Sequence, residues 1–154
     1  DGGVRAVVAA PAQFRPRPTW PPATRNPAAG CVGVMSGARE FALWLSPHIL
    51  TKTARVLAQL GLAVGATHEY VSVLVEIAED SGGGVLEPAR TVHDCPGHED
   101  NLILDLASEV GAFMIVSDDT DLTAMSPWRA TPILRPREFA GWVGATRRAK
   151  RRPR

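Results

Sequence analysis

The chain has 154 residues, of which 45% are hydrophobic and 21% are charged, and its formal net charge is +1. This length suits one domain with a real core, and the composition excludes the disordered and fibrous classes. No stretch is apolar enough for a membrane span and no signal-peptide pattern opens the chain, so we expect no membrane partner and a cytoplasmic location. Cys31 and Cys95 lack the spacing of a zinc site and are expected to be free thiols.

The first forty residues differ in composition from the rest of the chain. Six of the 13 prolines lie between Pro11 and Pro27, and Asp1 is the only acid among the first 39 residues. Prolines remove backbone donors and break helices, so polyproline-like or irregular structure is expected. The apolar run at residues 4–10 is the one candidate strand. Residues 1–40 are therefore interpreted as a Pro/Arg-rich segment, either a poorly ordered extension or an arm that touches an anionic partner.

From Phe41 onward, apolar residues recur with the periods of strands and helices. Strands show as short apolar runs, and helices show as apolar stripes bounded by capping residues, with Ser46 and Thr67 as expected N-caps. The expected elements are a strand at 41–46, a helix at 47–60, a helix at 67–80, a strand at 85–88, a helix at 99–110, a strand at 113–116, a strand at 131–134 and a helix from Pro136. This order predicts an α/β fold, a three-layer α/β/α domain with a central parallel sheet, over residues 41–143.

The chain ends in a basic segment, residues 144–154. Six of the eight residues from Arg147 to Arg154 are Lys or Arg, which makes this end too charged to pack. It could hold RNA phosphates, with salt-dependent and sequence-independent affinity, or it could be a disordered solubilising tail. The candidate nucleic-acid-binding residues are Arg147, Arg148, Lys150, Arg151 and Arg152.

Two acidic segments carry the candidate chemistry. Glu99 and Asp100 open the third helix, and the most apolar strand is followed by Asp118, Asp119 and Asp121. Functional groups gather at the carboxyl ends of parallel strands, so we expect the two segments to lie close together. Close carboxylates repel one another unless a cation compensates, and Mg²⁺ or Mn²⁺ prefers such hard oxygen ligands. For either segment alone, an acidic turn or compensation of a helix dipole is the alternative.

One part of the chain resembles the C-terminal half of a PIN domain, namely HEDNLILDLASEVGAFMIVSDDTDL at residues 98–122, followed by TPILRPREFAGWV at residues 131–143. LWLSPHILTKTARVL, residues 43–57, is similar to the second strand and following helix of that family. The resemblance covers residues 41–143 and is closest to the PIN-domain toxins of bacterial toxin–antitoxin systems, the VapC-like ribonucleases. It implies a Mg²⁺- or Mn²⁺-dependent endoribonuclease that acts on RNA, binds an antitoxin protein and often forms a homodimer.

The resemblance also assigns roles to individual acids. Asp100 matches the metal-binding acid that opens a helix, Asp119 matches the acid after the fourth strand, and Asp121 is its close companion. These three residues are the candidate catalytic and metal-binding residues. Asp118 falls where the family often has Gly or Asn, so it is a weaker candidate for the metal site.

Two acids of the family's metal site have no counterpart here. The family's first strand ends in Asp, whereas the run at residues 4–10 ends in Ala9-Ala10 without an acid, and a helical Glu of the family falls near Lys52, whose charge would oppose a cation. The alternative function is therefore a degenerate, inactive PIN-like module that binds RNA or a protein. A start or reading frame altered upstream of Gly37 would explain the lost Asp and the Pro-rich segment. An Asp-x-Asn motif in another frame of the coding DNA would support this hypothesis, and its absence would refute it.

Overall fold

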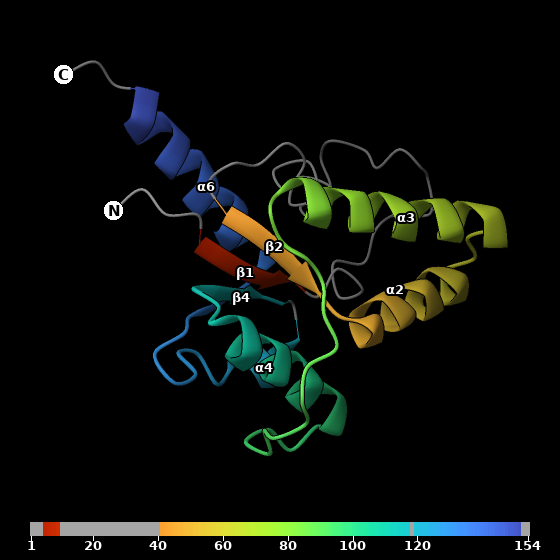
Figure 1. The fold of residues 1–154 in the computed structure, drawn as a ribbon, viewed down its shortest axis with the longest axis horizontal. Helices are drawn as coiled ribbons and strands as arrows, with labels where there is room; N and C mark the ends of the chain where they lie inside the picture. The colour runs from red at the N-terminus through yellow and green to blue at the C-terminus, as the bar shows by residue number, and fades with distance from the viewer. Residues whose placement is uncertain (1–4, 10–40, 118, 152–154) are drawn as a thin grey trace.

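The computed structural model describes residues 5–9, 41–117 and 119–151, so the expectations for most of the Pro/Arg-rich segment, for Cys31 and for Asp118 lie outside the described residues. Five parallel strands form one sheet with helices against it, in the order β3-β2-β1-β4-β5 (Figure 1). They are β1 (Arg5–Ala9), β2 (Phe41–Leu45), β3 (Gly84–Val85), β4 (Met114–Val116) and β5 (Ile133–Leu134). The predicted α/β class with a central parallel sheet is confirmed.

The apolar run near the N-terminus forms the central strand β1, which pairs with β2 on one side and with β4 on the other. Val7, Val8 and Ala9 are completely buried, and Ala9 lies beside Val116 at the last position of β4. The chain passes outward from β1 to β3 and then returns to β4, so the strand order reverses between β1 and β4. In open α/β sheets a ligand crevice lies at such a reversal, at the carboxyl ends of the strands.

Helix α2 (Pro47–Gln59) begins as predicted, because the Ser46 side chain accepts a hydrogen bond from the backbone N–H of Ile49 at 3.2 Å. The predicted start of the next helix is wrong. Helix α3 (Val64–Asp80) begins three residues before Thr67, and its N-cap is Ala63, which makes no side-chain hydrogen bond. The backbone N–H of Thr67 donates to the carbonyl oxygen of Ala63 at 2.9 Å, so the helical hydrogen bonding already includes the residues before Thr67.

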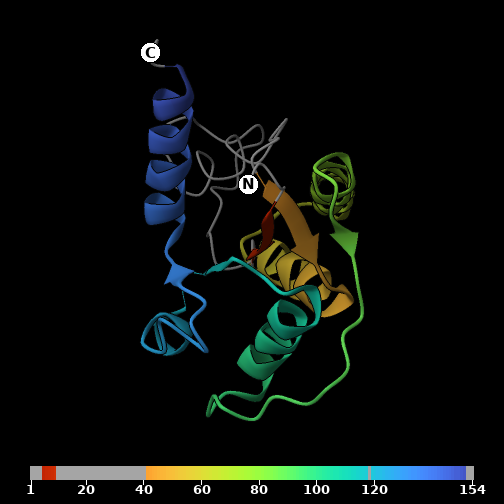
Figure 2. The same ribbon diagram turned by 60° about the vertical axis from the view of Figure 1, so that its left-hand side comes forward.

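The helices cover both faces of the sheet. Helix α3 contacts β2 and β3, whereas α4 (His98–Val110) contacts β1 and β2. The ribbon views place α3 and α4 on opposite sides of the sheet, with the start of α2 close to the start of α4 (Figures 1 and 2). Helix α4 ends at Gly111, which has the left-handed φ of 60° that glycine adopts without strain.

Two features at the C-terminal side differ from the expected elements. A short helix, α5 (Thr120–Thr123), follows the acidic turn and was not predicted. The last helix, α6 (Pro136–Arg151), continues through most of the basic end, although Arg148 and Arg151 remain exposed as expected for residues too charged to pack. None of the described helices is long and apolar enough to cross a membrane.

Candidate metal centre

Two of the predicted acids follow the carboxyl end of β4. Asp119 is the N-cap of α5, and its Oδ1 accepts a hydrogen bond from the backbone N–H of Asp121 at 2.8 Å. The backbone N–H of Asp119 donates to the Oγ of buried Ser117 at 3.1 Å. The segment is therefore an acidic turn that caps a helix, which is the alternative interpretation given above. The same turn also supplies two carboxylates. Asp118 lies outside the described residues.

Asp100 reaches the same place from the first turn of α4. Asp100 is only 6% exposed. The N-cap of this helix is Gly97, which has no side chain that could form a capping hydrogen bond. A Cβ atom at Gly97 would lie only 2.6 Å from Oδ2 of Asp100. Glycine at this position therefore leaves room for the carboxylate, which lies against the loop backbone.

The structure brings Asp100, Asp119 and Asp121 together, with one carboxylate oxygen from each lying within 4.8 Å of the others. Two oxygens bound to the same Mg²⁺ are at most about 4.2 Å apart, since each lies about 2.1 Å from the ion. The three-carboxylate cluster is thus close to the size of one ion's oxygen shell. Asp121 is exposed, so its side chain can close the small remaining difference by rotation.

The surroundings of Asp100 disfavour its ionised form. Burial raises the pKa of Asp100, and the negative charge of Asp119 raises it further. Asp121 acts in the same direction, whereas Lys52 and a hydrogen bond from Cys95 lower the pKa of Asp100. Burial also raises the pKa of the Cys95 thiol, which donates to Oδ2 of Asp100 at 3.7 Å. Part of the raised pKa of Asp100 thus comes from repulsion by neighbouring carboxylates, which a divalent ion bound among them would relieve.

Asp100→Asn should therefore stabilise the metal-free protein at pH 7. The pKa of Asp100 is raised in the folded state, so ionisation of this group costs stability as the pH rises through the folded pKa. The expected gain in the free energy of unfolding is on the order of 1 kcal/mol, typical of relieving a functional site. The gain should vanish below about pH 3.9, where the carboxyl is protonated in both states.

Urea unfolding in EDTA at pH 7 and pH 3.5 measures this difference. Asp80→Asn is the matched control, because Asp80 is an exposed acid at the end of α3 and lies outside the cluster. A variant at Asp100 that is less stable than the wild type at pH 7 would contradict the electrostatic account of the cluster.

Two polar side chains that the sequence did not single out hold the loop before α4 in place. Asn101 exchanges two hydrogen bonds with the backbone of Cys95, accepting from its N–H at 2.8 Å and donating to its carbonyl oxygen at 2.9 Å. Asp105 accepts from the backbone N–H groups of Thr91 and Val92 at 2.9 and 2.7 Å. Both side chains are buried on α4, so the helix fixes the loop that leads into the cluster.

Gly97→Ala should weaken metal binding without unfolding the protein. The added methyl group would displace the carboxylate of Asp100, and this movement costs little because the group is the end of a flexible side chain. The backbone of Gly97 has φ −80°, which alanine also adopts. Loss of a supporting contact around a metal ligand typically lowers affinity 10- to 100-fold, so we expect about a 10-fold loss for Mn²⁺ by calorimetry. Unchanged affinity would show that the observed position of Asp100 is not the metal-binding one.

The structure also locates Ala9 and Lys52, where the resemblance to PIN domains leads us to expect acids. Ala9 is buried at the carboxyl end of β1 and has no ligand atom to offer. Lys52 lies on α2 with its side chain 17% exposed, and its Nζ is 3.7 Å from Oε2 of Glu99. The positive charge of Lys52 lowers the pKa of Asp100, and Glu99 partly compensates this charge.

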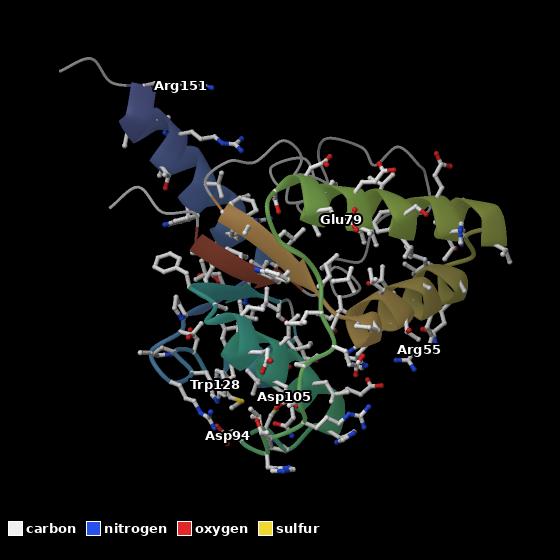
Figure 3. All side chains as sticks on the ribbon, viewed as in Figure 1. Arg55, Glu79, Asp94, Asp105, Trp128 and Arg151 are labelled. Carbon is white, nitrogen blue, oxygen red and sulfur yellow. The ribbon has the colours of Figure 1, made fainter. Side chains whose placement is uncertain are left out.

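Asp94, on the loop before α4, belongs to a separate group of side chains. Its Oδ2 accepts a hydrogen bond from Nε1 of Trp128 at 2.8 Å and lies 3.1 Å from a guanidinium nitrogen of Arg129 (Figure 3). Arg129 also lies over the Trp128 ring, 4.5 Å from its centroid. Trp128 is only 6% exposed, so a base could not stack on its ring without rearrangement.

The predicted basic residues lie far from the acids. Arg147, Arg148 and Arg151 are on the last turns of α6, which point away from α4 in both ribbon views. The side chain of Lys150 and the whole of Arg152 lie outside the described residues. The structure therefore does not bring these basic residues together with the three-carboxylate cluster.

Comparisons with models of known families, with curated proteins and with solved structures find no match to this chain.

Proposed function

We propose that this chain is a PIN-type, Mg²⁺- or Mn²⁺-dependent endoribonuclease. The observation that supports this most is the three-carboxylate cluster of Asp100, Asp119 and Asp121, which lies at the carboxyl ends of parallel strands. Residues 98–122 also resemble a PIN domain, and this resemblance assigns metal-binding acids to the same positions. Ribonuclease activity is thus the conclusion that the geometry and the sequence support together.

Each acid has a distinct part in the proposed reaction. Asp100 and Asp119 would hold the ion from α4 and from the N-cap of α5, and Asp121 would complete the oxygen ligands from the exposed side. A bound divalent ion supplies a Lewis acid at the phosphodiester and favours ionisation of a water molecule. The hydrogen bond from the backbone of Asp121 fixes the carboxylate of Asp119, so this ligand is already oriented before an ion binds.

The biological setting follows from the resemblance alone. We propose a cytoplasmic toxin of a bacterial toxin–antitoxin system, with an antitoxin that blocks the site and a homodimer as the assembly. Co-expression with the protein encoded by the adjacent gene and co-purification of the two chains would support this setting. Normal growth of cells that express the chain without that partner would contradict it.

A second function is favoured by the residues at two positions near the three-carboxylate cluster. Ala9 offers no ligand at the central strand, and Lys52 brings a positive charge to within reach of Asp100. A module that lost the family's chemistry but still binds RNA or a protein would tolerate both residues. This inactive PIN-like module is the alternative to the nuclease.

Cleavage of an unstructured single-stranded RNA separates the two functions. The nuclease should degrade the RNA with Mn²⁺ or Mg²⁺ present and stop in EDTA. Asp100→Asn should abolish the activity, whereas Asp80→Asn should retain it because Asp80 lies outside the cluster. RNA binding without turnover at any metal concentration would support the inactive module and refute the nuclease.

A further inference from the structure

A basic face of α2 lies beside the three-carboxylate cluster. His48, Lys52 and Arg55 follow the helical spacing i, i+4 and i+7, which places them on one face of α2. The pKa of His48 is lowered, mainly by burial, and the charges of Glu99, Lys52, Arg55 and Arg90 also act on it. The charge of Arg90, on the loop before α4, contributes least of these. Asp100 is the next residue after Glu99, and the charge of Lys52 lowers its pKa, so the basic face lies near the three-carboxylate cluster.

One carboxylate occupies this face in the structure. Glu99, in the first turn of α4, lies 3.7 Å from Nζ of Lys52 and 3.2 Å from a guanidinium nitrogen of Arg55. The hydrogen bond from Arg55 lowers the pKa of Glu99, with further contributions from Lys52 and from the charge of Arg55, so Glu99 remains ionised at neutral pH. Two cations thus share a single anion that comes from the protein itself.

The contact between Glu99 and the basic face can readily be exchanged for another. The side chains of Glu99 and Arg55 are 49% and 51% exposed, and exposed ion pairs of this kind contribute little to stability. A guanidinium and an ammonium also suit a phosphate, which accepts charge-assisted hydrogen bonds on several oxygens. Lys52 and Arg55 carry two positive charges against the single negative charge of Glu99, so the face favours a second anion.

We propose that Lys52 and Arg55 hold a backbone phosphate of the single-stranded RNA substrate, and that Glu99 occupies this phosphate site until the RNA displaces it. The identity of the ligand rests on the proposed function. The charge pattern supports RNA because the basic face and the three-carboxylate cluster adjoin each other through Glu99 and Asp100, so one strand could contact both. The basic turns of α6 lie elsewhere, and Arg151 is seen at the far end of that helix from Arg55 (Figure 3).

The test is fluorescence anisotropy with a labelled, mixed-sequence single-stranded RNA in EDTA, over a series of salt concentrations. Glu99→Gln should bind the RNA up to about 5-fold more tightly, since it removes an anion that competes through weak exposed ion pairs. Lys52→Ala combined with Arg55→Ala should bind about 10-fold more weakly at 0.1 M salt. The salt slope should then fall by about 1.4, because each lost contact to a single strand removes about 0.7.

Three further variants make these results specific. Glu109→Gln is the matched control for Glu99, because it removes an exposed carboxylate from the other end of the same helix. In the triple variant that lacks Lys52, Arg55 and Glu99, the gain from removing Glu99 should disappear. Arg148→Ala combined with Arg151→Ala tests the basic end of α6, and it should bind RNA more tightly than the double variant on α2.

The outcomes separate this proposal from the proposed function. Equal RNA affinity in Glu99→Gln, Glu109→Gln and the wild type would overturn the displacement of Glu99, even if Mn²⁺-dependent cleavage is found. Loss of binding only in the α6 variant would also overturn the proposal. A purely structural ion pair would lower the unfolding temperature in the Glu99 and Lys52–Arg55 variants and leave RNA affinity unchanged. Tighter binding by Glu99→Gln without any cleavage would support this phosphate site and refute the nuclease.

Discussion

Asp119→Asn is expected to lower Mn²⁺ affinity by more than about 100-fold, because loss of a direct ligand should exceed the 10- to 100-fold cost of losing a supporting residue. The fold should remain intact. Asparagine caps helices as well as aspartate does, so the hydrogen bond from the backbone N–H of Asp121 can be retained while the negative charge is removed. Calorimetric titration with Mn²⁺ measures the affinity, and circular dichroism checks the fold.

Asp94→Asn is the matched control for this substitution. It removes the same charge from a nearby loop, but Asp94 bonds to Trp128 and Arg129 and lies outside the three-carboxylate cluster. Its Mn²⁺ affinity should equal that of the wild type. If Asp119→Asn binds Mn²⁺ as tightly as the wild type, the acids after β4 serve only to cap α5.

Phe139→Ala should have the largest effect on stability, lowering the free energy of unfolding by about 3–5 kcal/mol. Phe139 is completely buried on α6, and its ring contacts Phe41 of β2 in an edge-on arrangement with centroids 5.2 Å apart. It also stacks on Trp142 at 6.2 Å. Removing the ring would leave a cavity between the last helix and the sheet. Urea unfolding followed by tryptophan fluorescence gives the difference.

Phe113→Ala provides the comparison within the same aromatic group. Phe113 also lies against Trp142, with centroids 5.9 Å apart, but it is 36% exposed. Folding removes less apolar area from water at Phe113 than at Phe139, so Phe113→Ala should lower the free energy of unfolding by only about 1 kcal/mol. Equal costs for the two variants would show that α6 does not pack on the sheet as described.

The elements that the sequence predicted well are those with strong local signals. Ser46-Pro47 marks the start of α2 by capping and by the fixed φ of proline, and Gly111 marks the end of α4 by its left-handed backbone. The start of α3 was predicted wrongly because Thr67 looks like a cap, while the real cap, Ala63, has no sequence signal. The helix begins instead with a hydrogen bond from the backbone N–H of Thr67 to the carbonyl oxygen of Ala63, and neither residue type signals this.

In the candidate site, too, the residues with a local sequence signal were predicted and the others were missed. Asp119 and Asp121 could be predicted because they come directly after an apolar strand, and Asp100 because it opens a helix that leads to that strand. The ion pairs of Glu99 with α2 could not be predicted, since they join residues 44 or more positions apart. The role of Asn101 was also missed, because an amide that bonds to the backbone of a nearby loop has no distinctive sequence pattern.

The central claim is that Asp100, Asp119 and Asp121 bind one divalent ion at the carboxyl edge of the sheet. Anomalous diffraction from crystals grown with Mn²⁺ locates such an ion directly. We expect a single strong peak about 2.0–2.2 Å from one oxygen of each carboxylate. Mn²⁺ found elsewhere on the protein, or no peak between these three residues at saturating Mn²⁺, would contradict the account.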